Sequence, residues 1–242
     1  MRAAILSDIH GNLEALDAVL EQIDREPPEV MVCLGDFVGY GAQPNECIER
    51  LRPRLEAAVL GNHDAAALGR LRLGSFNSDA ASAARWTETA LSPGSRAYLE
   101  SLPMSLAWRG ARLVHAAPLE PESWSYVLSL ADAEEEMAAY SEDLCFIGHS
   151  HFPGLFERDP HGVMRYTRAD ETRLERGHRY LVNVPSVGQP RDGDRRAGYL
   201  IWDDAVPEVR HVRLEYDVET AMRRILDAGL PRFLAERLQW GE

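Results

Sequence analysis

The chain has 242 residues, of which 45% are hydrophobic and 27% are charged, values that are ordinary for a globular protein. It carries 26 basic and 39 acidic residues, so the formal net charge is −13, which argues against a broad basic surface for long nucleic acids. All basic residues other than histidine are arginine. The lack of lysine excludes a P-loop lysine and Schiff-base catalysis.

The first residues and the cysteines favour a cytoplasmic protein with no membrane partner. Asp8 interrupts the first apolar run before the core of a signal peptide could form. No apolar run approaches the roughly 20 residues that span a bilayer. Cys33, Cys47 and Cys145 are too few and too scattered for a disulfide framework or a thiolate metal site. We expect Cys33 and Cys145, which lie in apolar runs, to be buried and reduced.

Strands and helices are predicted to alternate over the first part of the chain. Wholly apolar runs, typical of strands that are covered on both faces, span residues 3–6, 30–34, 57–60, 112–114 and 144–147. Asn12 is the predicted N-cap of an amphipathic helix that ends before Pro27 and Pro28, and Pro44 opens a second helix. This βαβαβ beginning predicts parallel strands with right-handed crossovers.

The rest of the chain is predicted to be helical first and then rich in strands. Asn77 or Ser78 could cap a helix that reaches residue 90, Ser92 and Pro93 could open another, and a third lies near 131–141. Strands follow at 154–157, 163–166, 180–184, 198–202 and 209–214, as in an antiparallel meander. Helices then follow Asp217 and Pro231. We expect one domain over 1–242, with a helical insertion at about 65–108 that could cover a cleft.

Each of the five early apolar runs ends in polar residues. In order, these are Asp8 and His10, then Asp36, then Gly61-Asn62-His63-Asp64, then His115, then Gly148-His149-Ser150-His151. Ligands in open α/β sheets bind beyond the carboxyl ends of the strands, so these side chains are expected to converge. Each block alone is a common turn or core feature. Together they predict a metal site.

The kinds of side chain indicate which metals would bind. Imidazole, carboxylate and amide groups without thiolate suit first-row transition ions. Seven candidate ligands are too many for one tetrahedral ion, so we expect two divalent ions per chain, about 3.5–4 Å apart. Manganese is our first choice, with iron, zinc, cobalt and nickel as alternatives.

The order of the five blocks resembles the calcineurin-like metallophosphoesterase superfamily over roughly residues 1–200. The small bacterial and archaeal phosphodiesterase branch, which is related to diadenosine tetraphosphate hydrolases, looks most similar, since Phe76-Asn77 and the runs 113–118 and 186–192 resemble its secondary signatures. The chain departs from this branch at Ala116 and Pro185, where glycine is more usual. The resemblance implies an α/β fold: a four-layer α/β/β/α sandwich of two packed mixed sheets flanked by helices.

The resemblance also implies a role for each residue of the site. Asp8, His10 and His151 would hold the first metal. Asn62, His115 and His149 would hold the second, and Asp36 would bridge the two. His63 would be the general acid that faces the substrate, and Asp64 would orient the ring of His63.

The expected reaction is the hydrolysis of a phosphoric ester without a covalent intermediate. A hydroxide held between the ions would attack phosphorus while His63 protonates the departing alkoxide. Arg191 could clamp a second phosphate, or it could be a solvated loop arginine beside Asp192 and Asp194. The aromatic side chains that follow the site strands either stack on a nucleobase or pack in the core and rim; they are Phe37, Tyr40 and Trp124.

These observations favour a cytoplasmic dinuclear phosphoesterase that acts on small phosphodiesters or nucleotide phosphates, with diadenosine tetraphosphate as one candidate. A phosphoprotein phosphatase is the first alternative and would need an open groove. A nuclease subunit is a second alternative, which the net charge disfavours. A catalytically silent metal-binding scaffold is the third, and the intact His63 argues against it. The expected partner is a small phosphoester or nucleotide, with no long nucleic acid and no assigned oligomeric state.

Overall fold

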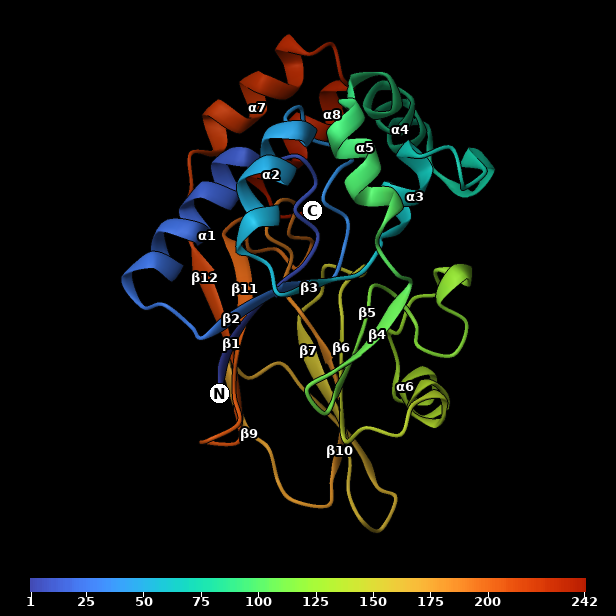
Figure 1. Ribbon diagram of the computed structural model, residues 1–242, viewed down its shortest axis with the longest axis vertical. Helices are drawn as coiled ribbons and strands as arrows, with labels where there is room; N and C mark the ends of the chain where they lie inside the picture. Colours follow the sequence, from blue (N-terminus) through green and yellow to red (C-terminus); the bar gives the residue numbers. More distant parts are fainter.

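Figure 1 shows the computed structural model, which describes residues 1–242 apart from the side chain of Ser75. Two six-stranded mixed sheets pack face to face. In spatial order the first sheet contains β3 (Ala57–Ala58), β2 (Val30–Cys33), β1 (Arg2–Leu6), β11 (Ala197–Asp203), β12 (Glu208–Leu214) and β9 (Glu171–Arg173). The second contains β4 (Ser105–Trp108), β5 (Ala111–Val114), β6 (Leu144–Ile147), β10 (Arg179–Asn183), β7 (Gly154–Arg158) and β8 (Met164–Thr167).

The apolar runs at the start of the chain form parallel strands that are buried on both faces. Strands β1, β2 and β3 run parallel to one another, as do β5, β6 and β10. Along β1, Ala3 and Ile5 face the second sheet, whereas Ala4 and Leu6 face the helices. This alternation explains why the run is apolar throughout, since neither face of the strand meets water.

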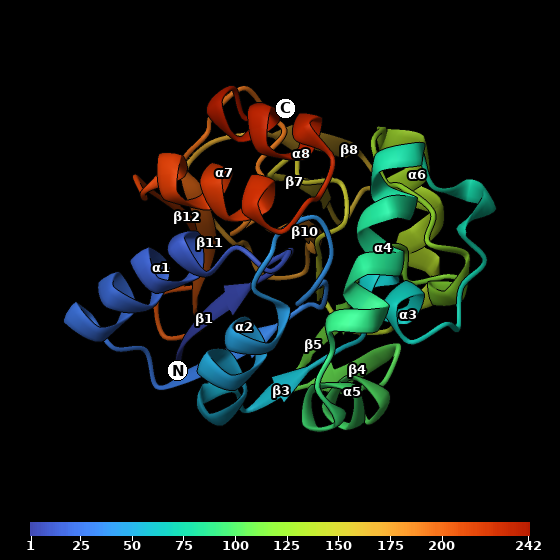
Figure 2. The ribbon, with the colours of Figure 1, turned by 90° about the horizontal axis from the view of Figure 1, so that it is seen from above.

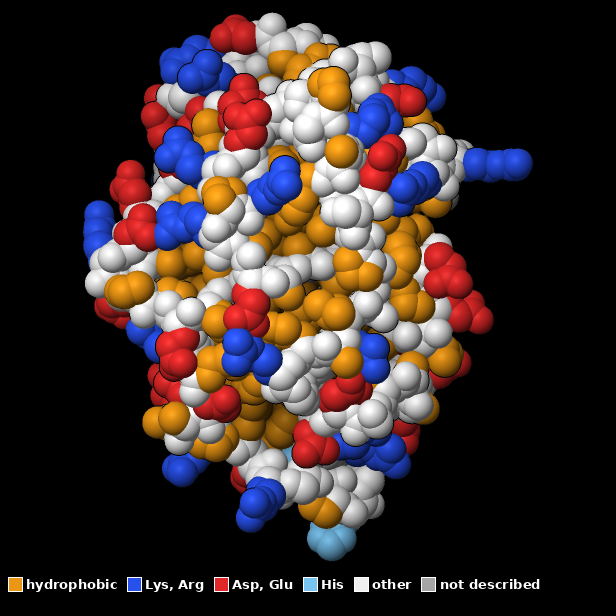
Figure 3. Space-filling model, in the orientation of Figure 1, with side chains coloured by type: hydrophobic (Ala, Val, Ile, Leu, Met, Phe, Trp, Pro, Cys, Tyr) orange, Lys and Arg blue, Asp and Glu red, His pale blue; other side chains and the backbone are white. Residues whose placement is uncertain are grey.

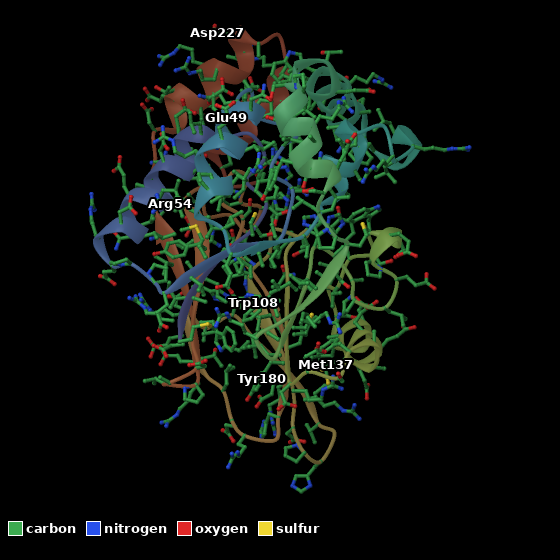
Figure 4. All side chains as sticks on the ribbon, viewed as in Figure 1. Glu49, Arg54, Trp108, Met137, Tyr180 and Asp227 are labelled. Atoms are coloured by element: carbon green, nitrogen blue, oxygen red, sulfur yellow. The ribbon has the colours of Figure 1, made fainter. Side chains whose placement is uncertain are left out.

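Helices cover the outer face of each sheet (Figures 1 and 2). The first sheet packs against α1 (Leu13–Arg25), α2 (Pro44–Leu51) and α5 (Pro93–Glu100), and the second against α6 (Leu130–Glu136). Helices α4 (Ser78–Ala90), α7 (Val218–Asp227) and α8 (Arg232–Glu236) share a further apolar cluster. Trp108 and Tyr180, labelled in Figure 4, lie in the core between the sheets. The predicted four-layer α/β/β/α sandwich is confirmed.

Local sequence signals predicted most helix ends correctly. Asn12 caps α1 by accepting from the backbone N–H of Ala15 at 3.1 Å, and Asn77 caps α4 by accepting from that of Ala80 at 2.9 Å. Asp217 likewise caps α7. The helix expected near 131–141 is shorter, since α6 ends at Glu136 and a 3₁₀ turn follows.

The predicted antiparallel meander is wrong in its connections. β7 and β8 form a hairpin, but β10 lies between β6 and β7 and runs parallel to β6, while β11 and β12 belong to the first sheet. Leu181 of β10 faces the α6 side and Val182 faces the core between the sheets. The turn residues between consecutive strands do not determine which strands pair, so they could not assign the neighbours of β10.

The carboxyl ends of β1, β2, β3, β5 and β6 meet at one edge of the sandwich, which Figure 2 views from above with α4, α7 and α8 around it. Acidic and basic side chains are interspersed on the face shown in Figure 3, around an apolar middle. In the part of the chain that the structure describes, no helix is both long and apolar enough to cross a membrane.

Candidate metal centre

The structure brings the predicted ligands together at this edge, and all of them are buried. With His63, the expected general acid, included, the ligand atoms form three overlapping groups: Asp8, His10 and His151; His10, Asp36 and His63; and Asp36, His115 and His149. Within each group the atoms lie within 4.8 Å of one another. Asn62 joins the third group, because its Oδ1 lies 3.2 Å from Nε2 of His115. Asp36 belongs to two groups, as expected of a shared ligand.

The backbone of most ligand residues is left-handed. Eight non-glycine residues have a positive φ, and five of them are the predicted ligands Asp8, His10, Asp36, His149 and His151, with φ between 51° and 65°. Such conformations are uncommon outside glycine and gather at functional sites, where the surrounding structure imposes them. Here they turn the chain sharply after β1, β2 and β6, so that side chains at neighbouring positions point to one spot.

Two glycines let the ligand loops approach closely. A Cβ on Gly61 would lie 2.1 Å from Oδ1 of Asp36, and one on Gly148 would lie 2.0 Å from Oγ of Ser7 and 2.6 Å from Oδ2 of Asp8. The glycines of the Gly61-Asn62-His63-Asp64 and Gly148-His149 blocks therefore belong to the site, since any side chain there would displace a ligand.

Backbone carbonyls fix the orientation of the ligand histidines. Nδ1 of His10 lies 3.2 Å from the carbonyl oxygen of Val38, and Nδ1 of His151 contacts that of Gln189. A carbonyl only accepts, so Nδ1 carries the proton and Nε2 of each neutral ring presents a lone pair. The two Nε2 atoms lie 3.1 Å apart. Two lone pairs at that distance repel, so this pair fits a bound cation.

The carboxylates complete the donor set. Oδ1 of Asp8 lies 3.2 Å from Nε2 of His151, and Oδ2 of Asp36 lies 3.3 Å from Nε2 of His115. Among the described residues, Oδ2 of Asp36 and Nε2 of His149 are buried without a hydrogen-bond partner. Buried polar atoms are rarely left unpaired, so these two fit a metal as the missing partner.

The protonation states also suit metal binding. Burial raises the pKa of Asp36, but the neighbouring His115 and His63 outweigh it and hold this pKa well below its usual range. Burial lowers the pKa of His149 to about 3 and that of His10 well below its usual value. His115 differs, since Asp36 and Asp8 overcome the effect of burial and raise its pKa to about 9. The centre thus holds charged carboxylates and mostly neutral imidazoles, the forms that bind metal.

A cavity of about 290 Å³ opens beside these residues. His63, His149 and Asn62 line its inner end, and Tyr40 lies against His63 with ring centroids 4.3 Å apart. Leu71, Phe76, Asn77 and Ala80 line the outer part, so the segment expected to cover the cleft forms one of its walls. The ring of His63 thus belongs to one ligand group and also faces the space available to a substrate.

Comparison with known proteins identifies the family. Residues 1–204 match the family model described as the calcineurin-like phosphoesterase superfamily domain. The chain belongs to this superfamily. An uncharacterised protein of Methanocaldococcus jannaschii is 39% identical over 242 residues, covering 98% of this chain and 97% of that protein. The predictions of the family and of a phosphoric ester hydrolase are confirmed.

Solved structures agree with this assignment. A metallophosphoesterase from Sphaerobacter thermophilus is 38% identical, with a TM-score of 0.88, over 100% of this chain and 99% of the other. A protein from Pyrococcus horikoshii, 20% identical with a TM-score of 0.79, shares the fold over 100% of this chain and 98% of its own.

Asp64 of this phosphoesterase does not orient His63 as expected. One carboxylate oxygen of Asp64 accepts from the backbone N–H of Asp36 at 2.8 Å and of Gly61 at 3.0 Å, and the other accepts from that of Val38 at 3.2 Å. Nδ1 of His63 has no partner among the described residues. Asp64 lies in the first turn of α3 (Asn62–Ala67), where a carboxylate folds back onto preceding N–H groups. It therefore holds the loop of Asp36.

Arg191 lies beside the site and is not a solvated loop residue. Its Nη2 donates to the Tyr40 hydroxyl at 3.1 Å and to Oε1 of Gln189 at 2.9 Å, and its guanidinium lies 5.5 Å from the Tyr40 ring centroid. Asp192 pairs instead with Arg213 at 2.5 Å. Tyr40 thus links Arg191 to His63.

The sequence interpretation missed Tyr126 and the carbonyls that orient the imidazoles. The Tyr126 ring stacks on that of His149, with centroids 4.2 Å apart and planes at 19°. Phe37, one of the aromatics that could have contacted a base, is fully buried and packs on Tyr98. Tyr126 lies in a loop outside every predicted strand end, so no local signal placed it at the site. Backbone carbonyls carry no residue signature at all.

Proposed function

We propose that the chain is a dinuclear, metal-dependent phosphodiesterase acting on small phosphodiesters or nucleotide phosphates, with diadenosine tetraphosphate as a specific candidate. The convergence of three overlapping ligand groups that share His10 and Asp36 is the observation that carries the proposal. Asp8, His10 and His151 would hold one ion, and Asn62, His115 and His149 the other. Asp36 would be common to both, and manganese is the ion we favour.

The residues of the chain divide the remaining chemistry between them. When bound, a pair of divalent ions would lower the pKa of a coordinated water and neutralise phosphate oxygens. His63 faces the cavity and is placed to protonate a leaving alkoxide. Burial lowers the pKa of His63 to about 4, and a bound phosphate anion would raise it toward the value that a general acid needs.

The size of the cavity supports a small substrate over a phosphoprotein. A volume of about 290 Å³ lies at the lower end of the range for small-molecule pockets, and the segment at 71–80 closes one side of it. Cys33, Cys47 and Cys145 are all free and buried, in keeping with the cytoplasmic location that we also propose.

A substrate panel on manganese-reconstituted protein tests the proposal. The panel contains bis-p-nitrophenyl phosphate, cyclic nucleotides, diadenosine tetraphosphate, a phosphoserine peptide and single-stranded DNA. We expect the small diesters or nucleotides to be hydrolysed fastest, and fastest turnover of the peptide or the DNA would refute the proposed class.

Metal content tests the dinuclear assignment. Elemental analysis should find about two ions per wild-type chain. Asp36→Asn should lose both, because Asp36 belongs to two ligand groups, whereas Asn62→Ala should lose mainly one. One ion or fewer in reconstituted wild type would contradict the dinuclear assignment.

A further inference from the structure

The cavity beside the metal centre has an inner end and an outer part that differ in chemistry. The inner end consists of the ligand residues Asn62 and His149 together with His63. The rest of the lining combines the aromatic side chains of Phe76, Trp124 and Tyr126 with polar side chains. A phosphate at the inner end would therefore place one of its ester groups among aromatic rings.

Tyr126 presents an accessible aromatic ring next to a metal ligand. One face of its ring lies on His149, at 4.2 Å between centroids, and 51% of the residue remains exposed. Tyrosine can bury its ring while keeping its hydroxyl in water, and a ring held against a fixed neighbour is a ready stacking surface. The contact with His149 places the ring directly beside the predicted metal centre.

Phe76 and Trp124 add two further aromatic rings to the lining of the cavity. The Phe76 ring contacts that of His63 at 5.0 Å between centroids, and the Trp124 ring lies 6.1 Å from that of His115. Trp124 also has a left-handed backbone, with φ of 55°, which is strained for so bulky a residue. The surrounding structure therefore holds Trp124 beside the centre in a strained backbone conformation.

The polar groups of the lining indicate the charge of the occupant. Glu122, Ser123 and Asn77 line the cavity, and none of its described lining residues is arginine. A second phosphate would meet the Glu122 carboxylate with no cation to neutralise it, whereas a neutral group with N–H or O–H donors would pair with that carboxylate. Arg191, which could bind another phosphate, donates to the hydroxyl of Tyr40, a lining residue that packs against His63 rather than beside Glu122.

We propose that the outer cavity is a nucleoside subsite in which the substrate's base stacks on Tyr126 and a sugar hydroxyl or ring amine donates to Glu122. This inference rests on the proposed function, since the nucleoside is the ester group of the phosphate that the centre would hydrolyse. A cavity of about 290 Å³ lies near the lower end of the range for small-molecule pockets, which suits one nucleoside.

A pair of esters with the same leaving group isolates the nucleoside. Thymidine 5′-(p-nitrophenyl phosphate) and methyl p-nitrophenyl phosphate both release p-nitrophenolate, so their ratio of kcat/KM reports on the nucleoside alone. Stacking of a base on an aromatic side chain accounts for about a 5- to 150-fold effect on removal of the ring. We expect wild-type protein to prefer the thymidine ester by at least about tenfold, and Tyr126→Leu to remove that preference through KM.

Three further variants control for indirect effects. Tyr126→Phe should keep the preference, because it keeps the ring. Leu128→Ala, at a residue that is 63% exposed two positions along the same loop, should change nothing. Glu122→Gln should weaken binding of the nucleoside ester while leaving the methyl ester within about twofold. Elemental analysis of each variant shows whether both ions are retained.

Equilibrium binding gives a readout that is independent of turnover. By calorimetry, wild-type protein should bind AMP at least about tenfold more tightly than ribose 5-phosphate, and Tyr126→Leu should bind the two equally. Equal affinities in wild type, or an equal loss on both esters in a Tyr126→Leu protein that keeps its metal, would overturn the subsite. If wild type distinguished AMP from ribose 5-phosphate but hydrolysed neither ester, the subsite would stand and the proposed function would fail.

Discussion

Replacing His63 by alanine separates proton donation from metal binding. The His63 ring contacts those of Tyr40, Phe76 and His10, at centroid distances of 4.3, 5.0 and 5.0 Å. Such contacts stabilise the folded chain by about 0.5–1.5 kcal/mol each. The substitution also removes Nδ1 of His63, which is buried without a hydrogen-bond partner among the described residues, and this gain offsets part of the loss. We expect His63→Ala to fold, with a free energy of unfolding lower by about 1–2 kcal/mol.

The catalytic effect of this change should depend on the leaving group. A general acid contributes about 10²–10⁴-fold when a poor leaving group such as a ribose alkoxide departs, and little when p-nitrophenolate departs as a stable anion. Because burial lowers the pKa of His63 to about 4, the ring is mostly neutral at pH 7 before substrate binds. Most of the effect should therefore arise in the substrate complex.

The assay compares kcat/KM on a dinucleoside substrate and on bis-p-nitrophenyl phosphate, with metal content measured in parallel. His63→Ala should lose about 10²-fold or more on the first and less than about fivefold on the second, while keeping both ions. His161→Ala, at an exposed histidine in the β7–β8 turn, is the matched control. Equal loss on both substrates, or an emptied metal position, would refute the assigned role. His63 would then be a ligand, as its place in a group with His10 and Asp36 allows.

Three other predictions test separate parts of the structure. Arg191→Ala should slow hydrolysis of diadenosine tetraphosphate about tenfold or more but that of bis-p-nitrophenyl phosphate less than about threefold; equal slowing would argue against a second phosphate at Arg191. Gly148→Ala should lower metal content as measured by elemental analysis, whereas Gly74→Ala, where an added Cβ meets nothing within 4 Å, should not; full occupancy in both would contradict the close approach. Burial lowers the pKa of His211 to about 4 in the folded chain, below its value of about 6.5 in the unfolded chain. As the pH falls from 6.5 to 4, the unfolded chain therefore binds a proton at His211 before the folded chain does, and the free energy of unfolding should fall by up to about 3 kcal/mol. His211→Gln should flatten that part of the curve in urea titrations, and unchanged curves would exclude His211 as the cause.

The sequence was informative wherever one short segment carried both the fold and the chemistry. The runs that end at Asp8, Asp36 and His115 combine a buried parallel strand with a ligand at its carboxyl end, so a single local pattern predicted both. The edge strands β4 and β9 lacked that pattern. Glu171–Arg173 is only three residues long and largely exposed, and Ser105–Trp108 is only partly buried. Weak burial leaves little hydrophobic signal to read.

Interactions between distant segments could not be predicted from the sequence, for a different reason. The partners of Asp64 are backbone N–H groups on its own loop and on the loop of Asp36, and no side-chain pattern encodes them. Likewise the position of Tyr126 on His149 depends on how a loop without regular structure folds back on the sheet edge. The ligands of the centre were predictable because the strands place them, whereas the groups that hold and surround the ligands are placed by tertiary packing.

The left-handed backbone at the ligands has a consequence for how this protein can change. A left-handed conformation costs a non-glycine residue roughly 1–2 kcal/mol, so five such ligands together cost at least about 5 kcal/mol, comparable with the whole stability of many domains. Substituting glycine for a ligand would relieve that strain and abolish the centre in one step. In a descendant of this chain that no longer needed catalysis, this relief would favour loss of the histidine ligands first, because Asp8 and Asp36 also accept from the buried backbone N–H groups of His149 and His63. This chain keeps aspartate or histidine, and not glycine, at all five left-handed positions, as expected of a protein that is still selected to bind metal.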